Sequence, residues 1–281
     1  MRSLWFALVL TAASIPALSG QTPDAAQVVS SVREALGGEK KLSAVRTFTA
    51  TGRTRQIRGN NLVPIEFEMN CELPDRFVRK DEIPAQDTDP TTRGFSGDML
   101  IQIPPPGAGR GGRAAVPAPG GAPPAGAQGR AGGPPLGGGR GSGAPVPPIV
   151  AIKQDFARLM LGMFAASFPS YPLTFKYGAV GQAPEGQADI LDVTGPANFS
   201  LRFVVQRDTH LPVMLMWSAP APGQPAPAEQ RIYFADYRDV DGLKLPFRIR
   251  RAVGADTVEE TTFDRFRINA KIDPRKFEIP K

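Results

Sequence analysis

Few side chains in this sequence have the types and spacing that catalysis requires. His210 is the only histidine and Cys71 the only cysteine of the chain. A cysteine or serine nucleophile is activated by a neighbouring base, most often histidine, and a zinc site built on histidine needs further ligands. His210 lies in D-T-H-L-P, between two predicted strands, and Cys71 ends a predicted strand in M-N-C-E-L-P. We therefore interpret Cys71 as a small packed residue and predict neither a catalytic triad nor a zinc site.

Two groups of acidic residues have spacings that are similar to functional sites. Asp236, Asp239 and Asp241 form D-x-x-D-x-D-G, which departs from the spacing of a calcium loop and lacks its final glutamate. We interpret them as solvated turn carboxylates. Glu259 and Glu260 are adjacent in a predicted strand, so their side chains point to opposite faces and cannot act as a pair. Zinc, phosphate-loop and dinucleotide motifs are also missing, so we predict a protein that is not an enzyme and has no cofactor or metal.

The elements that would position these residues are mainly strands, and the clearest is a hairpin around Asp241-Gly242. Apolar residues alternate with polar ones on both sides of this turn, which is typical of two half-buried antiparallel strands. The apolar positions are Ile232, Phe234, Leu245, Phe247 and Ile249. Glycine allows the positive φ that a tight reversal requires. Pro246 has no backbone N–H, so we expect its strand to lie at a sheet edge or to begin near this residue.

Four stretches of the second half of the chain share a pattern of turns and strands. They are A-D-I-L-D-V-T-G-P at 188–196, L-R-F-V-V-Q-R-D-T-H-L-P-V at 201–213, V-D-G-L-K-L-P at 240–246 and I-x-x-x-I-D-P-x-x-F at 268–277. This pattern resembles the LolA-like outer-membrane lipoprotein-sorting proteins of bacteria, and the resemblance covers most of the chain outside residues 104–148. It implies a periplasmic protein that holds acyl chains in an apolar cavity between a curved sheet and its helices.

The start of the chain has the composition of an export signal. Arg2 precedes a run of apolar residues, and small residues follow it. We interpret residues 1–20 as a secretory signal peptide, cleaved near residues 17–21, and expect a periplasmic protein. No later run approaches the roughly 18 unbroken apolar residues of a membrane span.

Residues 104–148 break the strand pattern, because glycine and proline occupy more than half of the positions. The segment has four arginines and no acidic residue. It cannot bury enough apolar surface to offset the entropy of ordering, so we predict a disordered surface insertion. The motif G-R-G-G-R resembles nucleic-acid-binding arms, but aromatic residues for base stacking are missing, so we predict no nucleic-acid partner. Without these arginines and Arg2, the formal net charge falls from +6 to +1, and the folded part is nearly neutral.

Two helices are predicted. The first begins near Thr22, which can cap it, and ends at Gly37-Gly38. The second covers residues 149–166, where apolar residues recur at helical spacing opposite polar ones. Its stripe of phenylalanine and methionine is explained equally well by packing on a sheet and by a lid over a lipid chain.

The rest of the chain is predicted to form strands. Besides the hairpin, they cover residues 47–57, 62–70, 76–81, 94–103, 173–179, 189–193, 199–206, 213–217 and 256–268. So many antiparallel strands must close into a barrel or be covered on one face. We therefore predict a mainly β (α+β) fold, a curved, incompletely closed antiparallel β-barrel covered by two helices. Residues 21–103 and 149–281 form one domain of this kind, with the insertion between them.

The predicted function is that of a periplasmic binding or carrier protein with acyl chains of lipid or lipoprotein as ligand. The expected partner is an inner- or outer-membrane envelope protein, and we expect a monomer. Eight apolar residues are candidates for the cavity, each equally explained as core: Ile65, Phe67, Phe156, Met160, Phe164, Leu215, Trp217 and Phe247. The alternative is a non-catalytic envelope interaction module with a filled barrel, which contacts its partner through the Gly/Pro/Arg insertion. A carrier needs a void of several hundred cubic ångströms, which a filled barrel lacks.

Overall fold

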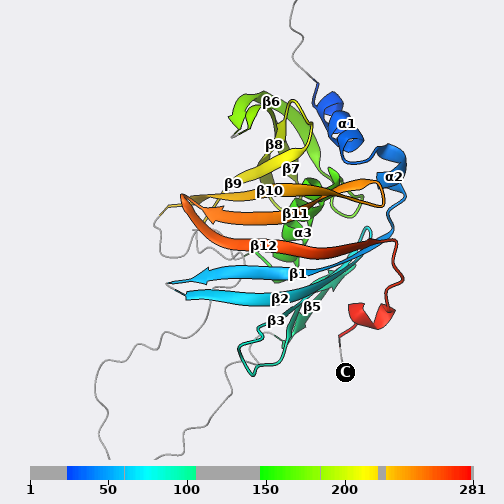
Figure 1. Ribbon diagram of the computed structural model, residues 1–281, viewed down its shortest axis with the longest axis vertical. Helices are drawn as coiled ribbons and strands as arrows, with labels where there is room; N and C mark the ends of the chain where they lie inside the picture. Colours follow the sequence, from blue (N-terminus) through cyan, green and yellow to red (C-terminus); the bar gives the residue numbers. More distant parts are fainter. Residues whose placement is uncertain (1–23, 60, 106–145, 184, 221–225, 280–281) are drawn as a thin grey trace, which may run out of the picture.

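The computed structural model describes residues 24–59, 61–105, 146–183, 185–220 and 226–279. Within these residues, twelve strands form one antiparallel sheet that curves around a helix (Figure 1). The strands are β1 (Thr47–Arg58), β2 (Asn61–Glu72), β3 (Arg76–Glu82), β4 (Thr91–Ser96), β5 (Met99–Ile103), β6 (Thr174–Ala183), β7 (Gly186–Gly195), β8 (Phe199–Gln206), β9 (Pro212–Ala219), β10 (Ala228–Val240), β11 (Leu243–Val253) and β12 (Asp256–Ile268). The helices are α1 (Ala25–Ala35), α2 (Glu39–Ser43) and α3 (Pro148–Phe164), and the 3-10 helix η2 (Pro274–Phe277) follows β12.

The order of strands across the sheet is β5-β4-β3-β2-β1-β12-β11-β10-β9-β8-β7-β6. The sheet therefore consists of two meanders, joined where the last strand of the chain pairs with the first. The edge strands β5 and β6 do not pair with each other, so the barrel stays open. This confirms the predicted mainly β fold, with its curved and incompletely closed antiparallel sheet. Helix α2 was not among the two predicted helices.

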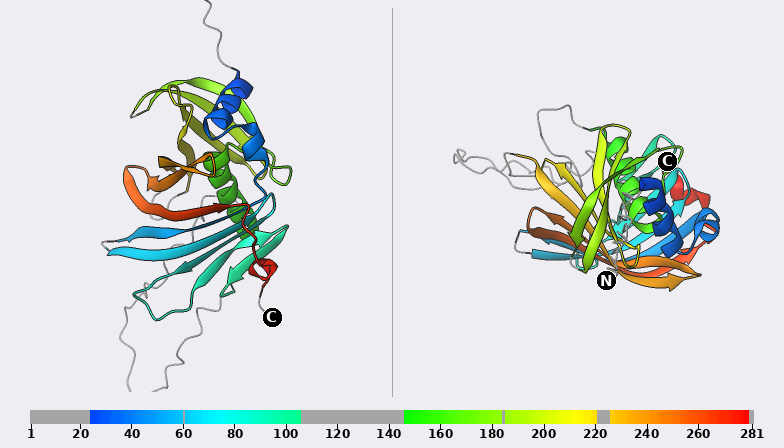
Figure 2. Two further views of the ribbon diagram at one scale, coloured as in Figure 1. Left: turned by 45° about the vertical axis from the view of Figure 1, so that its right-hand side comes forward. Right: turned by 90° about the horizontal axis from the view of Figure 1, so that it is seen from above.

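Helix α3 lies inside the curve of the sheet, and its second half is part of the core (Figure 2). Met160, Leu161 and Met163 are fully buried. At Gly162 an added Cβ would lie 2.0 Å from the ring of Phe234, so only glycine lets the helix approach β10 this closely. The observed helix ends at Phe164, slightly before the predicted end, because Ala165 adopts a left-handed conformation.

The two N-terminal helices cover one end of this core. The carboxylate of Asp24 accepts a hydrogen bond from the Ala26 N–H at 3.4 Å and caps α1. The predicted cap, Thr22, lies outside the described residues. Arg33 of α1 donates to the backbone oxygens of Phe164 at 3.0 Å and Ala165 at 3.3 Å. The last carbonyl groups of a helix have no N–H partner within it, and here Arg33 of α1 supplies donors for those at the end of α3.

The turn between β4 and β5 and the place of Pro246 differ in part from the predicted pattern. Residues 94–103, predicted as one strand, belong to the two strands β4 and β5, because Gly97 reverses the chain with φ of 59°. Pro246 lies in β11, which is flanked by β10 and β12 and is not an edge strand. Its position near the start of the strand resolves the conflict, since the pairing of β11 with β12 begins only at Arg248.

Two predicted segments fall largely outside the described residues. The signal peptide at 1–20 lies wholly outside them, and of the insertion at 104–148 the structure describes only residues 104–105 and 146–148. Among the helices that are described, none combines the length and apolarity needed to cross a membrane.

Candidate functional site

A cavity of about 1100 Å³ lies between helix α3 and the concave face of the sheet. Its wall is formed by α3 on one side and by residues of β1 to β5 and β10 to β12 on the other. Exposed residues of the loop between β3 and β4, among them Gln86, Thr88 and Asp89, belong to the lining. Pro104 and Val146, which lie close to the two ends of the insertion, also line it. The cavity therefore opens to solvent beside the β3–β4 loop and the ends of the insertion.

One part of the lining is apolar. Its larger apolar side chains, apart from Val146 at the opening, are Ile65, Met69, Phe77, Ile83, Ile103, Ile152, Phe156, Leu159, Ile232, Phe234, Ile249 and Phe263. Phe156 of α3 anchors this wall, since its ring centroid lies 5.2 Å from the ring centroids of both Phe77 and Phe95. The helix thus forms part of the cavity with the same aromatic side chain that attaches it to β3 and β4.

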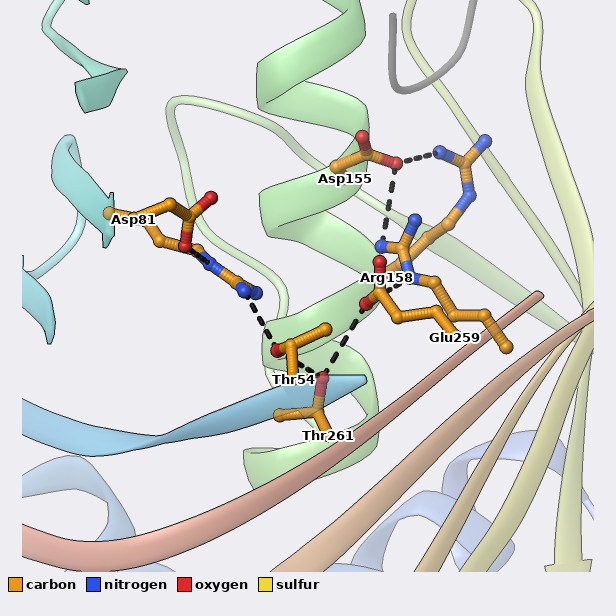
Figure 3. Close-up of polar contacts among 8 residues, drawn as sticks. Thr54, Asp81, Asp155, Arg158, Glu259 and Thr261 are labelled. Atoms are coloured by element: carbon orange, nitrogen blue, oxygen red, sulfur yellow. Dashed lines mark hydrogen bonds and ion pairs between the residues drawn. The ribbon is translucent and has the colours of Figure 1, made fainter. Parts of the chain in front are cut away.

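The other part of the lining is a polar network that crosses the sheet (Figure 3). Arg79 of β3 binds the carboxylate of Asp81 at 2.7 Å and the hydroxyl of Thr54 at 2.9 Å. The Thr54 and Thr261 hydroxyl oxygens lie 2.8 Å apart, and the Thr261 hydroxyl is 3.5 Å from a carboxylate oxygen of Glu259. Both threonines are buried, so each of these contacts satisfies a group that water reaches poorly.

Two arginines connect the network to helix α3. A guanidinium nitrogen of Arg251 is 4.0 Å from Glu259 and another is 4.0 Å from Asp155. Asp155 also accepts a 3.0 Å hydrogen bond from Arg158. The Arg158 guanidinium lies 4.3 Å from the ring centroid of Trp217. Burial lowers the pKa of Arg158. Asp155 is thus held between two cations, which ties the middle of α3 to β11.

The eight predicted cavity residues fall into two groups. Ile65 and Phe156 line the cavity. The other six lie in or against the hydrophobic core and are not in the lining: Phe67, Met160, Phe164, Leu215, Trp217 and Phe247. Phe164 packs on Phe48, with ring centroids 5.4 Å apart, and Phe247 packs on Phe266 at 5.2 Å.

The polar lining was missed by sequence reasoning. Arg79 and Asp81 follow Phe77 at the spacing of two residues that places side chains on one face of a strand. On β1, Ala50, Gly52 and Thr54 are spaced by two residues in the same way, and all three are buried. The same alternation that predicts the apolar face of a strand therefore also indicates which polar residues lie on that face.

The cysteine and two of the turn carboxylates that were considered for catalysis are buried or bound to neighbouring groups of the fold. Cys71 is fully buried, and burial raises the pKa of its thiol well above the ordinary value. Asp239 accepts a 3.0 Å hydrogen bond from the Gly242 N–H, and Asp236 pairs with Arg238. Within the described ranges, no group of three or more histidine, cysteine or acidic side chains is arranged to hold a metal ion.

Comparison with solved structures yields similar folds at low sequence identity. The crystal structure of a LolA superfamily protein from Nitrosomonas europaea aligns with a TM-score of 0.52 and 9% identity, covering 91% of this chain and 98% of that chain. A putative outer membrane lipoprotein-sorting protein domain from Vibrio parahaemolyticus has a TM-score of 0.49 and 9% identity, covering 90% and 97% of the two chains. A DUF1329 family protein from Desulfovibrio piger has a TM-score of 0.47 and 8% identity, covering 91% and 98%.

Comparison at the level of sequence identifies no related protein. No family model matches the sequence, and no curated protein matches it. The similarity to the Nitrosomonas protein shows that the fold is LolA-like, which confirms the predicted resemblance at the level of the fold.

Proposed function

We propose that this LolA-like chain is a non-catalytic periplasmic binding or carrier protein that holds acyl chains of lipid or lipoprotein in the cavity between α3 and the sheet. The observation that carries the proposal is the cavity itself. Its volume of about 1100 Å³ is slightly above the range of roughly 300–1,000 Å³ for ligand sites, so the cavity is large enough for a ligand. A barrel filled by its own side chains would not have such a void, so the cavity favours the carrier over the interaction module.

The chemistry of the lining supports a ligand with a long apolar part. Burying a chain of about 16 carbons contributes on the order of 10 kcal/mol, at about 0.8 kcal/mol per methylene. Association costs about 4–15 kcal/mol in lost freedom, so this burial is large enough to matter but leaves a modest net affinity. Reversible binding is what a carrier requires. Export to the periplasm is supported by the predicted signal peptide at residues 1–20.

Native mass spectrometry with lipid extraction tests the proposal on the full-length chain produced in a bacterial host. We expect acyl species to co-purify in near-stoichiometric amounts. Ile152→Asp places a carboxylate in the apolar wall and is expected to reduce the bound lipid at least about tenfold, because an unpaired charge beside an acyl chain is strongly unfavourable. Val150→Asp is the matched control, since Val150 is also half-buried on α3 but does not line the cavity.

A second result would decide against the carrier. If the purified protein is empty and also fails to take up a fluorescent fatty acid, the interaction-module function replaces it. Equal loss of lipid in the Ile152→Asp and Val150→Asp variants would also contradict the cavity as the binding site, because both variants then act through the helix rather than through the wall.

A further inference from the structure

Two arginines stand side by side on the cavity face of the sheet. Arg79 of β3 and Arg93 of β4 are direct partners in the antiparallel register, and both line the cavity. Gln102 of β5 is the next partner across from Arg93 and also belongs to the lining. Like charges directly opposite each other in a sheet are destabilising. The pair therefore carries an electrostatic cost unless other groups neutralise one of the two charges.

Among the residues that the structure describes, only one of these two arginines has a neutralising partner. Arg79 has the carboxylate of Asp81 and the hydroxyl of Thr54 as partners. Arg93, although only partly exposed, has no hydrogen bond or ion pair to any of the residues that the structure describes. The nearby acidic residue of the loop, Asp89, is exposed to solvent, where water and salt screen its charge.

The position of Arg93 along its strand divides the cavity into an apolar depth and a polar entrance. Two residues further along the same face, Phe95 packs against Phe156 in the core. Two residues in the other direction, Thr91 borders the exposed loop that opens to solvent. An amphiphile that enters here would place its tail among the aromatic rings and its head group beside Arg93.

We propose that Arg93, with Gln102 beside it, is the head-group subsite of this cavity and selects acyl ligands that end in a carboxylate or phosphate. This inference rests on the proposed acyl-binding function and deepens it. The guanidinium donates charge-assisted hydrogen bonds to the oxyanion, and the Gln102 amide adds a neutral donor.

The test compares a charged and an uncharged ligand with the same tail. A pyrene-labelled hexadecanoic acid and its methyl ester are titrated by fluorescence into the full-length chain and into Arg93→Gln. We expect Arg93→Gln to bind the acid about tenfold more weakly and the ester unchanged, because only the acid makes charge-assisted bonds. Gln102→Leu is expected to weaken the acid about threefold and to leave the ester unchanged.

Lys80→Gln is the matched control for a change of net charge. Lys80 follows Arg79 in β3, so it lies on the opposite face of the sheet, and it is exposed. Its replacement is expected to change the binding of neither ligand. Competition by a lysophosphatidate with the same chain then distinguishes the two oxyanions, because the tighter competitor identifies a phosphate or a carboxylate head.

Three results would overturn the proposal, and they are distinguishable. If the wild-type chain binds acid and ester equally well, the carrier function stands and the head-group subsite falls. If Arg93→Gln weakens both ligands by the same factor, Arg93 has only a structural role. If the wild-type chain binds neither ligand, the proposed function fails and the subsite fails with it. Thermal unfolding of each variant verifies that it is folded at the assay temperature.

Discussion

Replacing Gly162 with alanine tests how closely helix α3 must approach strand β10. A Cβ at this position would lie 2.0, 2.3 and 2.5 Å from three ring atoms of Phe234. Carbon atoms in contact are normally about 3.5–4.0 Å apart, so the ring or the helix must move by roughly 1.5 Å. Alanine also favours a helix by about 1 kcal/mol over glycine, so the two effects oppose each other.

The steric effect is expected to dominate. Adding a methyl group to a packed core costs about 1–3 kcal/mol, and the required movement places this case near the upper end. After the gain in helix propensity, we expect a net loss of about 1–2 kcal/mol in the free energy of unfolding. For a domain of this size that corresponds to a fall of about 2–8 °C in Tm. Because Phe234 lines the cavity, its displaced ring is also expected to reduce ligand uptake.

Chemical denaturation of a double-mutant cycle measures this contact directly. In a Phe234→Leu background the ring is gone, so Gly162→Ala is expected to be neutral or to stabilise by up to about 1 kcal/mol through helix propensity. Gly162→Ala is thus expected to destabilise the chain when Phe234 is present and not to destabilise it when Phe234 is replaced by leucine. An equal loss of stability in both backgrounds would refute the steric reasoning and assign the cost to the helix itself.

Two further predictions concern titratable groups. Hydrogen bonds from Arg33 and Ser43 lower the pKa of Glu39 from 4.5 to about 2. A carboxylate whose pKa is lower in the folded state stabilises the fold above its unfolded pKa and loses that contribution as the pH falls through the folded pKa. Denaturation between about pH 5 and 2 is therefore expected to show a shallower loss of stability for Glu39→Gln than for the wild type, and equal slopes would contradict it. Burial raises the pKa of the Cys71 thiol, so a thiol reagent at pH 8 is expected to label the chain only after denaturant is added. Rapid labelling of the folded chain would show that Cys71 is accessible.

Local patterns predicted the strands well where a strand has a clear beginning and end. The predicted strands at residues 199–206 and 256–268 have the observed bounds of β8 and β12. Each follows residues with positive φ, Asn198 and Gly254, which reverse the chain sharply before it. The prediction failed at Gly97, where the turn between β4 and β5 is short and the flanking residues continue to alternate.

The cavity could be predicted less well than the sheet, for a physical reason. Alternation shows that a residue faces inward, but packing decides whether it meets another side chain or a void. Phe67 and Ile65 are neighbours on the same face of β2, yet only Ile65 lines the cavity, because Phe67 packs on Phe263 at 5.5 Å between ring centroids. Phe67 also lies below the guanidinium of Arg79, 4.4 Å from its ring centroid. Such contacts depend on the register of strands far apart in sequence.

The two interpretations of helix α3, core element and lid, make different demands on the two halves of the helix. Its C-terminal half is fixed by the close approach of Gly162 to Phe234 and by the hydrogen bonds from Arg33 to Phe164 and Ala165. Its N-terminal half carries Ala151, Ile152 and Asp155 along the cavity. This half makes an ion pair between Lys153 and Asp98, a hydrogen bond from the Gln154 amide to the Ala197 oxygen, and the contacts of Asp155 with its two arginines.

This division has a consequence for motion. Exposed ion pairs contribute about 0–1 kcal/mol, whereas deleting buried contacts of the kind made by the C-terminal half costs several kcal/mol. The first turns of α3, before Phe156 reaches the core, are therefore held more weakly than the rest of the helix. Hydrogen exchange should accordingly be faster at the amides of residues 152–155 than at those of residues 160–164, and a uniform rate along the helix would contradict this division.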